Sequence, residues 1–280
     1  MCGAGSLLTL TPSLRNSALN NAQPTASPGR VEPFVPGRFQ WLRVVVTGAG
    51  SGIGLATTVR IAQEGGSVLA TDVDPARLKA LVRAHPELDI TPIIGDVRDD
   101  LHIAAIAAAC GDVLDGLVNN AGINDGFTPL DEVTDALWDQ ILAINLTAPF
   151  KLTRALLPAL QRSPQGAIVN VSSEAGLRGS CSGTAYTVSK HALLGLTRSI
   201  AVLYDTPRCN AIAPGGVATN IDGKVRSERG AQRLMRVNEA IAPPLAQPEQ
   251  LAAAIAFLLS RDSSNINGVT LPCDGGWNAL

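Results

Sequence analysis

The chain of 280 residues is 46% hydrophobic and 16% charged, a composition that can bury a substantial core and that excludes a largely disordered chain. Its 22 Lys and Arg residues against 24 Asp and Glu residues give a net charge of −2, so we expect no nucleic-acid partner, because a phosphate backbone is bound by an excess of basic residues. The apolar runs are shorter than the roughly 18 residues of a membrane-spanning helix, so we expect no membrane partner.

The first 40 residues differ in composition from the rest of the chain. They contain five prolines and many Ser, Thr and Asn residues, with no sustained hydrophobic period. We expect residues 1–40 to form a disordered extension, although three arginines against one acid also resemble a transit peptide. Residues 41–280 are then expected to fold as one domain.

From Trp41 onward, short β-rich apolar runs alternate with longer stretches of helical period. The predicted strands are Arg43–Thr47, Ser67–Thr71, Thr91–Ile94, Gly116–Asn119, Ala167–Val171, Arg208–Ala213 and Val269–Leu271. The predicted helices include Gly52–Gln63, Pro75–Ala84, Asp135–Gln161, Thr184–Tyr204 and Pro248–Ser260. This alternation predicts an α/β fold, a single-domain, Rossmann-type, doubly wound parallel sheet of about seven strands flanked by helices.

A glycine-rich turn joins the first predicted strand to the first predicted helix. It consists of Gly48, Ala49, Gly50, Ser51, Gly52, Ile53 and Gly54. Glycines let a backbone approach a pyrophosphate closely, and the N–H groups and dipole of the following helix favour an anion. The turn therefore predicts a dinucleotide site, the alternative being a glycine-rich turn that binds no ligand.

An acid closes the second predicted strand. Asp72 follows Gly48 by 24 residues, about where a dinucleotide-binding fold uses a carboxylate to accept hydrogen bonds from the adenosine ribose. A 2′-phosphate would be repelled there, and the loop offers Ser51 rather than a basic side chain. Asp72 thus favours NAD over NADP, unless it is only a turn residue at the end of a strand.

A tyrosine and a lysine lie one helical turn apart in the predicted helix Thr184–Tyr204. Tyr186 and Lys190 share a helix face, so the cation can favour the phenolate and make the tyrosine a usable acid and base. Spacing alone is also compatible with an ordinary pair on a helix surface.

Together these residues resemble the single-domain branch of the short-chain dehydrogenase/reductase family. The resemblance covers about residues 41–280 and follows the family's motif order: Thr47 to Gly54, Asp96-Val97, Asn119-Asn120-Ala121-Gly122, Asn145, Ser173, Tyr186 with Lys190, and Pro214 to Thr219. It implies a dinucleotide-binding and catalytic domain that transfers hydride.

The resemblance also implies a role for each catalytic residue. Tyr186 is expected to exchange a proton with the substrate oxygen, and Ser173 to hydrogen-bond that oxygen. Lys190 is expected to bind the nicotinamide ribose and to lower the pKa of Tyr186, while Asn145 holds a water that links Lys190 to solvent.

The remaining family positions imply contacts with the cofactor. Asp96 and Val97 are expected at the adenine, Asn119 in the central sheet near the cofactor, and Ala121 and Gly122 in the cofactor site, with Gly122 beside the ribose. The segment with Pro214, Gly215, Val217 and Thr219 is expected to close over the nicotinamide. Asn119 and Val217 also suit plain loop or core roles.

Several weaker signals surround these motifs. Arg229, Arg233 and Arg236 share one helical face, which suits either an acidic carrier or a solvated surface. Glu174 and Cys181 flank the catalytic residues and are candidates for the pocket wall, whereas His191 is expected on the helix surface.

The five cysteines are Cys2, Cys110, Cys181, Cys209 and Cys273. Their odd number and wide spacing predict neither a disulfide framework nor a metal site, and a reducing cytoplasm fits them best.

We therefore predict an NAD-dependent oxidoreductase acting on a small-molecule secondary alcohol or ketone. One alternative is a 3-oxoacyl-carrier-protein reductase, which the resemblance associates with NADPH. Another is a catalytically silent dinucleotide-binding scaffold or sensor. The family resemblance further implies a homotetramer formed through the helices Asp135–Gln161 and Thr184–Tyr204.

Overall fold

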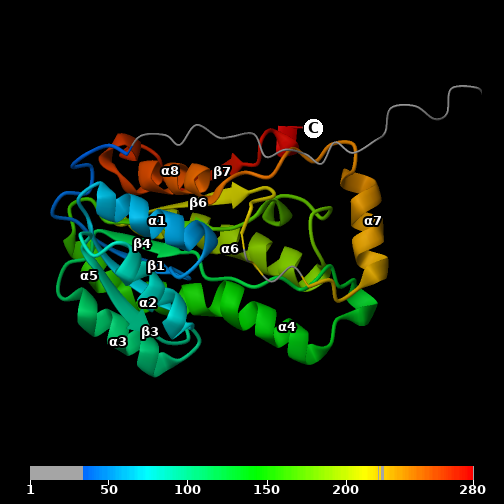
Figure 1. The fold of residues 1–280 in the computed structure, drawn as a ribbon, viewed down its shortest axis with the longest axis horizontal. Helices are drawn as coiled ribbons and strands as arrows, with labels where there is room; N and C mark the ends of the chain where they lie inside the picture. Colours follow the sequence, from blue (N-terminus) through cyan, green and yellow to red (C-terminus); the bar gives the residue numbers. More distant parts are fainter. Residues whose placement is uncertain (1–33, 220, 222–223, 280) are drawn as a thin grey trace, which may run out of the picture.

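The computed structural model describes residues 34–219, 221 and 224–279. Seven parallel strands form one sheet in the order β3-β2-β1-β4-β5-β6-β7 (Figure 1). The strands are β1 (Arg43–Thr47), β2 (Ser67–Asp72), β3 (Ile90–Ile94), β4 (Gly116–Asn119), β5 (Ala167–Val171), β6 (Arg208–Pro214) and β7 (Thr270–Cys273). The predicted α/β fold is confirmed. The bounds of β1, β4 and β5 equal the predicted ones, and the ends of the other four strands differ by at most two residues.

Helices cover both faces of the sheet and bury two separate clusters of apolar side chains. The cluster on one face joins the sheet to α1 (Gly52–Gln63), α2 (Pro75–Ala84) and α8 (Pro248–Leu259). The cluster on the other face joins it to α3 (Asp100–Cys110), α5 (Ala148–Arg162) and α6 (Thr184–Leu203). Because both faces are buried, the central strands consist mostly of apolar residues, as the continuous runs in the sequence indicated.

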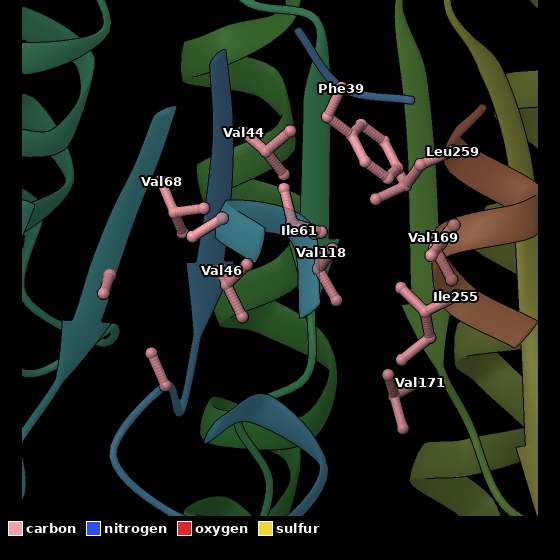
Figure 2. Packing of buried hydrophobic residues seen from close by; sticks show 14 of the residues in the cluster. Phe39, Val44, Val46, Ile61, Val68, Val118, Val169, Val171, Ile255 and Leu259 are labelled. Carbon is pink, nitrogen blue, oxygen red and sulfur yellow. The ribbon is translucent and has the colours of Figure 1, made fainter. Parts of the chain in front are cut away.

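The folded unit begins earlier than Trp41. Phe39 is only 1% exposed and packs with Val44, Ile61 and Leu259 (Figure 2). The backbone N–H of Val35 also donates to the buried carboxylate of Glu64 at 3.0 Å. The expected disordered extension over residues 1–40 therefore includes residues of the folded domain, Val35 and Phe39. The buried Phe39 side chain contributes to the core. Residues 1–33 lie outside the described residues.

The predicted helix over Asp135–Gln161 is interrupted. The structure has α4 (Asp135–Leu142), a π-helical segment (Ala143–Thr147) and then α5. Pro149 has no N–H to donate to the carbonyl of residue 145, so the regular hydrogen-bond ladder cannot continue there. The wider turn contains Asn145, and such π segments often occur at functional sites.

The chain reverses direction across the sheet beside β1. It builds β1, β2 and β3 outward on one side and then returns to place β4 on the other side of β1. Loops that leave β1 and β4 therefore separate at the carboxyl edge of the sheet, which is where open α/β sheets bind ligands.

Candidate active site

A large cavity lies along the carboxyl edge of the sheet. Its volume is about 860 Å³ and its wall spans loops from β1 to β6. Most of the predicted site residues lie in this wall: Gly48, Ser51, Gly52, Ile53, Asp72, Asp96, Val97, Ala121, Gly122, Ser173, Tyr186, Lys190, Pro214, Gly215, Val217 and Thr219. Motifs up to 171 residues apart in the sequence thus meet at one site.

The glycine loop shapes one end of the cavity. The backbone packs so tightly there that a Cβ on Gly54 would lie 2.1 Å from the carbonyl oxygen of Gly48. Ser51 precedes α1, and among the described residues its side chain accepts no capping hydrogen bond from that helix. The N–H groups of the first turn of α1 therefore face this end of the cavity without a side-chain cap, as a phosphate site requires.

Asp72 lies beside the glycine loop and organises it. The side chain is 6% exposed, and its carboxylate accepts hydrogen bonds from the N–H groups of Gly50 and Asp74, each at 2.9 Å. The carboxylate also borders the cavity, so it can meet a ribose hydroxyl.

A basic residue that the sequence analysis did not single out also lines this end. Arg77, in the first turn of α2, borders the cavity near Asp72 and lies with its Nε 3.2 Å from Asp74. The only sequence signal for Arg77 was its place in the helix after Asp72. This end of the cavity is therefore lined by both an acidic and a basic side chain, and Asp72 alone does not describe it.

The Asp96-Val97 turn completes the same end of the cavity. The Asp96 carboxylate is paired with the guanidinium of Arg98, which holds the pKa of Asp96 below its usual range. Both side chains border the cavity, where the resemblance expects an adenine.

Ser173, Tyr186 and Lys190 meet at the middle of the cavity. Ser173 follows β5, while Tyr186 and Lys190 lie one turn apart on α6. The Ser173 hydroxyl is hydrogen-bonded to the phenol of Tyr186. The ammonium of Lys190 donates to the carbonyl of Val171 at 2.8 Å and lies 5.5 Å from the centre of the Tyr186 ring.

Burial dominates the electrostatics of this group. It raises the pKa of Tyr186 to about 12, although the hydrogen bond from Ser173 acts in the opposite direction. It also lowers the pKa of Lys190 to about 8. The direction of the shift in the Tyr186 pKa is opposite to the one expected from the neighbouring cation, because desolvation of the phenolate is the largest effect.

Asn145 ties three segments together. Its side-chain oxygen accepts from the N–H of Ile123 at 2.9 Å, and its amide nitrogen donates to the carbonyl of Ile123 and to the Ser189 hydroxyl. These bonds join the π-helical segment to the loop after β4 and to α6, so Asn145 orders the surroundings of the catalytic group.

Four predicted residues are not in the wall formed by the described residues: Gly50, Gly54, Asn119 and Asn145. Asn119 instead donates from its amide to the Thr153 hydroxyl on α5 and to the Asn170 side chain on the neighbouring strand β5. Its expected place in the central sheet agrees with these bonds, and a direct contact of Asn119 with the cofactor stays a prediction.

The far end of the cavity is mostly apolar. It lies under α7 (Glu228–Asn238), which stands at one end of the molecule (Figure 1). The sequence analysis did not identify its apolar wall, because the residues come from separate loops and from α7: Phe127, Ile221, Val225, Leu234, Met235, Leu245 and Trp277.

One acid is buried in this part of the wall. Glu174 is 1% exposed, with Arg178 Nε 2.7 Å from its carboxylate, and Arg178 in turn lies over the Trp277 ring. Burial and the nearby Asp274 raise the pKa of Glu174 against the effect of Arg178. Glu174 and Cys181 thus line the cavity, whereas the His191 ring bonds to the Thr187 carbonyl of its own helix.

The arginine face of α7 is partly engaged within the chain. Arg229 pairs with Asp131 and, at 2.9 Å, with Glu132, two exposed acids that precede α4. These pairs connect α7 to the body of the protein. Arg229 is therefore not free for an external acidic partner.

Two further findings concern the described part of the chain. No helix there is long and apolar enough to cross a membrane. Within the same residues, no group of three or more His, Cys, Asp or Glu side chains is arranged to hold a metal ion.

Comparisons with known proteins agree with this geometry. The family model described as enoyl-(acyl carrier protein) reductase matches residues 48–278. The short-chain dehydrogenase/reductase cdmF of Talaromyces verruculosus is 40% identical over 259 residues, covering 87% of this chain and 100% of that protein.

Two solved structures have a similar fold. Levodione reductase superimposes with a TM-score of 0.78 at 32% identity, covering 86% of this chain and 99% of that chain. A structure assigned as an NAD(P)-dependent gluconate 5-dehydrogenase of Beutenbergia cavernae, with NADP bound at low occupancy, gives 0.77 at 32% identity, covering 87% and 100%.

Proposed function

The chain belongs to the short-chain dehydrogenase/reductase family, and on that premise we propose that it transfers hydride between NAD(H) and a secondary alcohol or ketone. It is an NAD(P)-dependent oxidoreductase by family. The observation that carries the finer proposal is the meeting of Ser173, Tyr186 and Lys190 in one cavity wall with the glycine loop.

The cavity has the features that a nicotinamide dinucleotide needs. The uncapped first turn of α1 suits the pyrophosphate, and the Asp72 carboxylate suits ribose hydroxyls. Within the part of the chain that the structure describes, the buried ammonium of Lys190 donates to one acceptor, the carbonyl of Val171, and its other donors are left for the second ribose. When bound, the nicotinamide supplies or accepts the hydride.

The protein's own residues handle the proton. During ketone reduction the Tyr186 phenol donates its proton to the substrate oxygen, and during alcohol oxidation the phenolate takes one. The Ser173 hydroxyl holds that oxygen beside the phenol. The high pKa of Tyr186 means that the phenol is already protonated at neutral pH, which is the form that reduction requires.

Cofactor preference depends on two opposing side chains. Asp72 favours NAD by repelling a 2′-phosphate and by accepting from the free ribose hydroxyls. Arg77, which lines the same end, favours NADP, and the Beutenbergia cavernae relative binds NADP. We favour NAD because both Asp72 oxygens are held in place by backbone N–H groups, whereas Arg77 is half-exposed and paired with Asp74.

The substrate is proposed to be a small to medium hydrophobic molecule. The apolar side chains of Phe127, Leu234 and Met235 border the end of the cavity beyond the catalytic group. A carrier-protein substrate is less favoured because Arg229 is paired within the chain. A silent scaffold is less favoured because such a protein needs no set of catalytic side chains.

We further propose that the protein acts in the cytoplasm and that it forms a homotetramer. The described cysteines Cys110, Cys181, Cys209 and Cys273 are unpaired, which agrees with a reducing compartment. The tetramer is proposed from the family resemblance, with α4, α5 and α6 at the main contact.

The deciding experiment is a binding titration with NADH and NADPH, followed by turnover assays under the preferred cofactor. Secondary alcohols, ketones and 3-oxoacyl thioesters form the substrate panel. Tighter binding of NADH with turnover of a free alcohol or ketone supports the proposal. Preference for NADPH with thioester turnover, or binding without any turnover, would overturn it in favour of one of the two alternatives.

A further inference from the structure

A buried acid outside the family motifs lies at the start of the catalytic helix. Asp125, in the loop after β4, is 0% exposed. Its carboxylate accepts hydrogen bonds from the backbone N–H groups of Gly183, at 3.1 Å, and of Tyr186, at 3.0 Å. One of these two donors belongs to the tyrosine of the catalytic group itself.

The start of α6 depends on this loop. The residue at the N-cap position is Gly183, which has no side chain to cap the helix, so Asp125 supplies the acceptors from 58 residues away. The fit is close: a Cβ on Gly183 would lie 2.5 Å from both carboxylate oxygens. The N–H of Thr184 also donates to the Thr128 carbonyl of the same loop at 2.9 Å.

The Asp125 carboxylate also places a negative charge near the Tyr186 phenol, the group that must ionise. Besides burial, two side chains act on the pKa of the Tyr186 phenol: a hydrogen bond from Ser173 favours the phenolate, and the negative charge of Asp125 opposes it. The Lys190 ammonium lies 5.5 Å from the centre of the ring. Other ionisable groups also lie near this loop and in the cavity wall. They are Arg226, which packs against Gly126, and Glu174, Cys181, Asp72, Arg77, Asp96 and Arg98.

We propose that Asp125 is a positioning residue that clamps the first turn of α6 and holds the proton on the Tyr186 phenol. The inference rests on the proposed role of Tyr186 as proton donor and acceptor. Asp125 acts through the backbone and through its charge, so it affects both where the phenol lies and at which pH it ionises. It is thus suited to an enzyme that must keep a phenol protonated for reduction.

The test compares Asp125→Asn with the parent protein in a Tyr204→Phe background. The chain has two tyrosines, so this background leaves Tyr186 as the only phenol, and its ionisation can be followed by tyrosinate absorbance without any substrate. Loss of the charge should move this ionisation to lower pH by about 0.5 to 1 unit. The pH profile of alcohol oxidation should move in the same direction.

The kinetic constants separate positioning from folding. An Asn amide can accept only one of the two N–H bonds, so kcat should fall by about tenfold while the dissociation constant for NADH stays within about twofold. Asp112→Asn, which removes an exposed acid, is the matched control and should change neither quantity.

If Asp125→Asn does not fold, Asp125→Ser provides a neutral acceptor at the same place for the same titration. An unchanged tyrosinate ionisation in either folded variant would overturn the charge role, and an unchanged kcat would overturn the positioning role. Because the titration needs no turnover, a failed substrate assay would count against the proposed function and not against this inference.

Discussion

At the scale of single residues, the catalytic group shows how strongly burial controls ionisation. Tyr186 and Lys190 both lie in the protein interior, and burial shifts each pKa toward the neutral form. The tyrosine therefore holds its proton, and the lysine holds its charge less firmly than a surface lysine. The proposed proton transfer depends on the Tyr186 hydroxyl, whose neighbours come from several different elements. Its role can therefore be tested by removing that single oxygen atom.

The first prediction removes that hydroxyl. Tyr186→Phe should lower kcat by about 10²- to 10⁴-fold, because general acid–base catalysis typically contributes that much. Binding of NADH should stay nearly unchanged, since the ring and Lys190 remain. Steady-state turnover and a fluorescence titration with NADH measure the two effects, and Tyr204→Phe, at the end of α6, is the control that should keep its activity.

The second prediction concerns Asp72 and Arg77. Asp72→Ala should raise the ratio of NADPH to NADH affinity by at least about tenfold, because the carboxylate no longer repels a 2′-phosphate. In the double variant with Arg77→Gln, most of this increase in the NADPH to NADH affinity ratio should be lost. Direct titration of both cofactors measures the ratio, with Asp89→Ala, an exposed acid before β3, as control. A ratio that does not move would show that Asp72 does not read the ribose.

At the scale of elements, one contact between α3 and β2 depends on a buried histidine. His102 is 7% exposed, and its Nε2 lies 2.7 Å from the Thr71 hydroxyl at the end of β2. Burial lowers the pKa of His102, against the opposing effects of Asp99 and Asp96. The neutral ring is therefore the form that the folded protein keeps.

The third prediction follows from this shift. A histidine whose pKa is lowered in the folded state contributes free energy of unfolding above its unfolded pKa, near 6.5, and that contribution is lost as the pH falls through the folded pKa. The free energy of unfolding should thus fall as the pH drops below about 6.5. His102→Gln keeps an amide near Thr71 but does not titrate, so denaturant unfolding should show a weaker pH dependence. Equal pH dependence in both proteins would contradict the assignment.

At the scale of the whole molecule, the proposed assembly can be tested through exposed apolar side chains. Phe150 on α5 is 44% exposed and Val188 on α6 is 40% exposed, and both lie on helices expected at the tetramer contact. Burying such side chains between subunits would remove apolar area from water.

The fourth prediction is that the protein sediments as a tetramer and that Phe150→Asp shifts it to smaller species. A buried unpaired carboxylate is costly at such a contact. Leu101→Asp, on α3 and 80% exposed, introduces the same charge away from the proposed contact and should leave the mass unchanged. Sedimentation velocity at several protein concentrations gives the answer, and equal behaviour of the two variants would place the contact elsewhere.

Local patterns were enough to predict the order of strands and helices and most of the wall of the cavity. The glycine loop, Asp72 and the Tyr186/Lys190 pair could be recognised because each depends on neighbours within a turn or on the end of one strand. Hydrophobic runs likewise predicted the parallel sheet, since a strand buried on both faces has little choice of residue.

Other features depended on contacts between distant parts of the chain. Asp125 could not be linked to Tyr186 from sequence, because the two meet only when the loop after β4 packs against the start of α6. The interruption at Asn145 and the burial of Phe39 have the same origin, as does the raised pKa of Tyr186. The sequence by itself therefore determined the family and the fold, and it predicted which groups react. Only the tertiary structure decided how those groups are buried, held and charged, because desolvation and hydrogen bonding depend on which distant segments surround each atom.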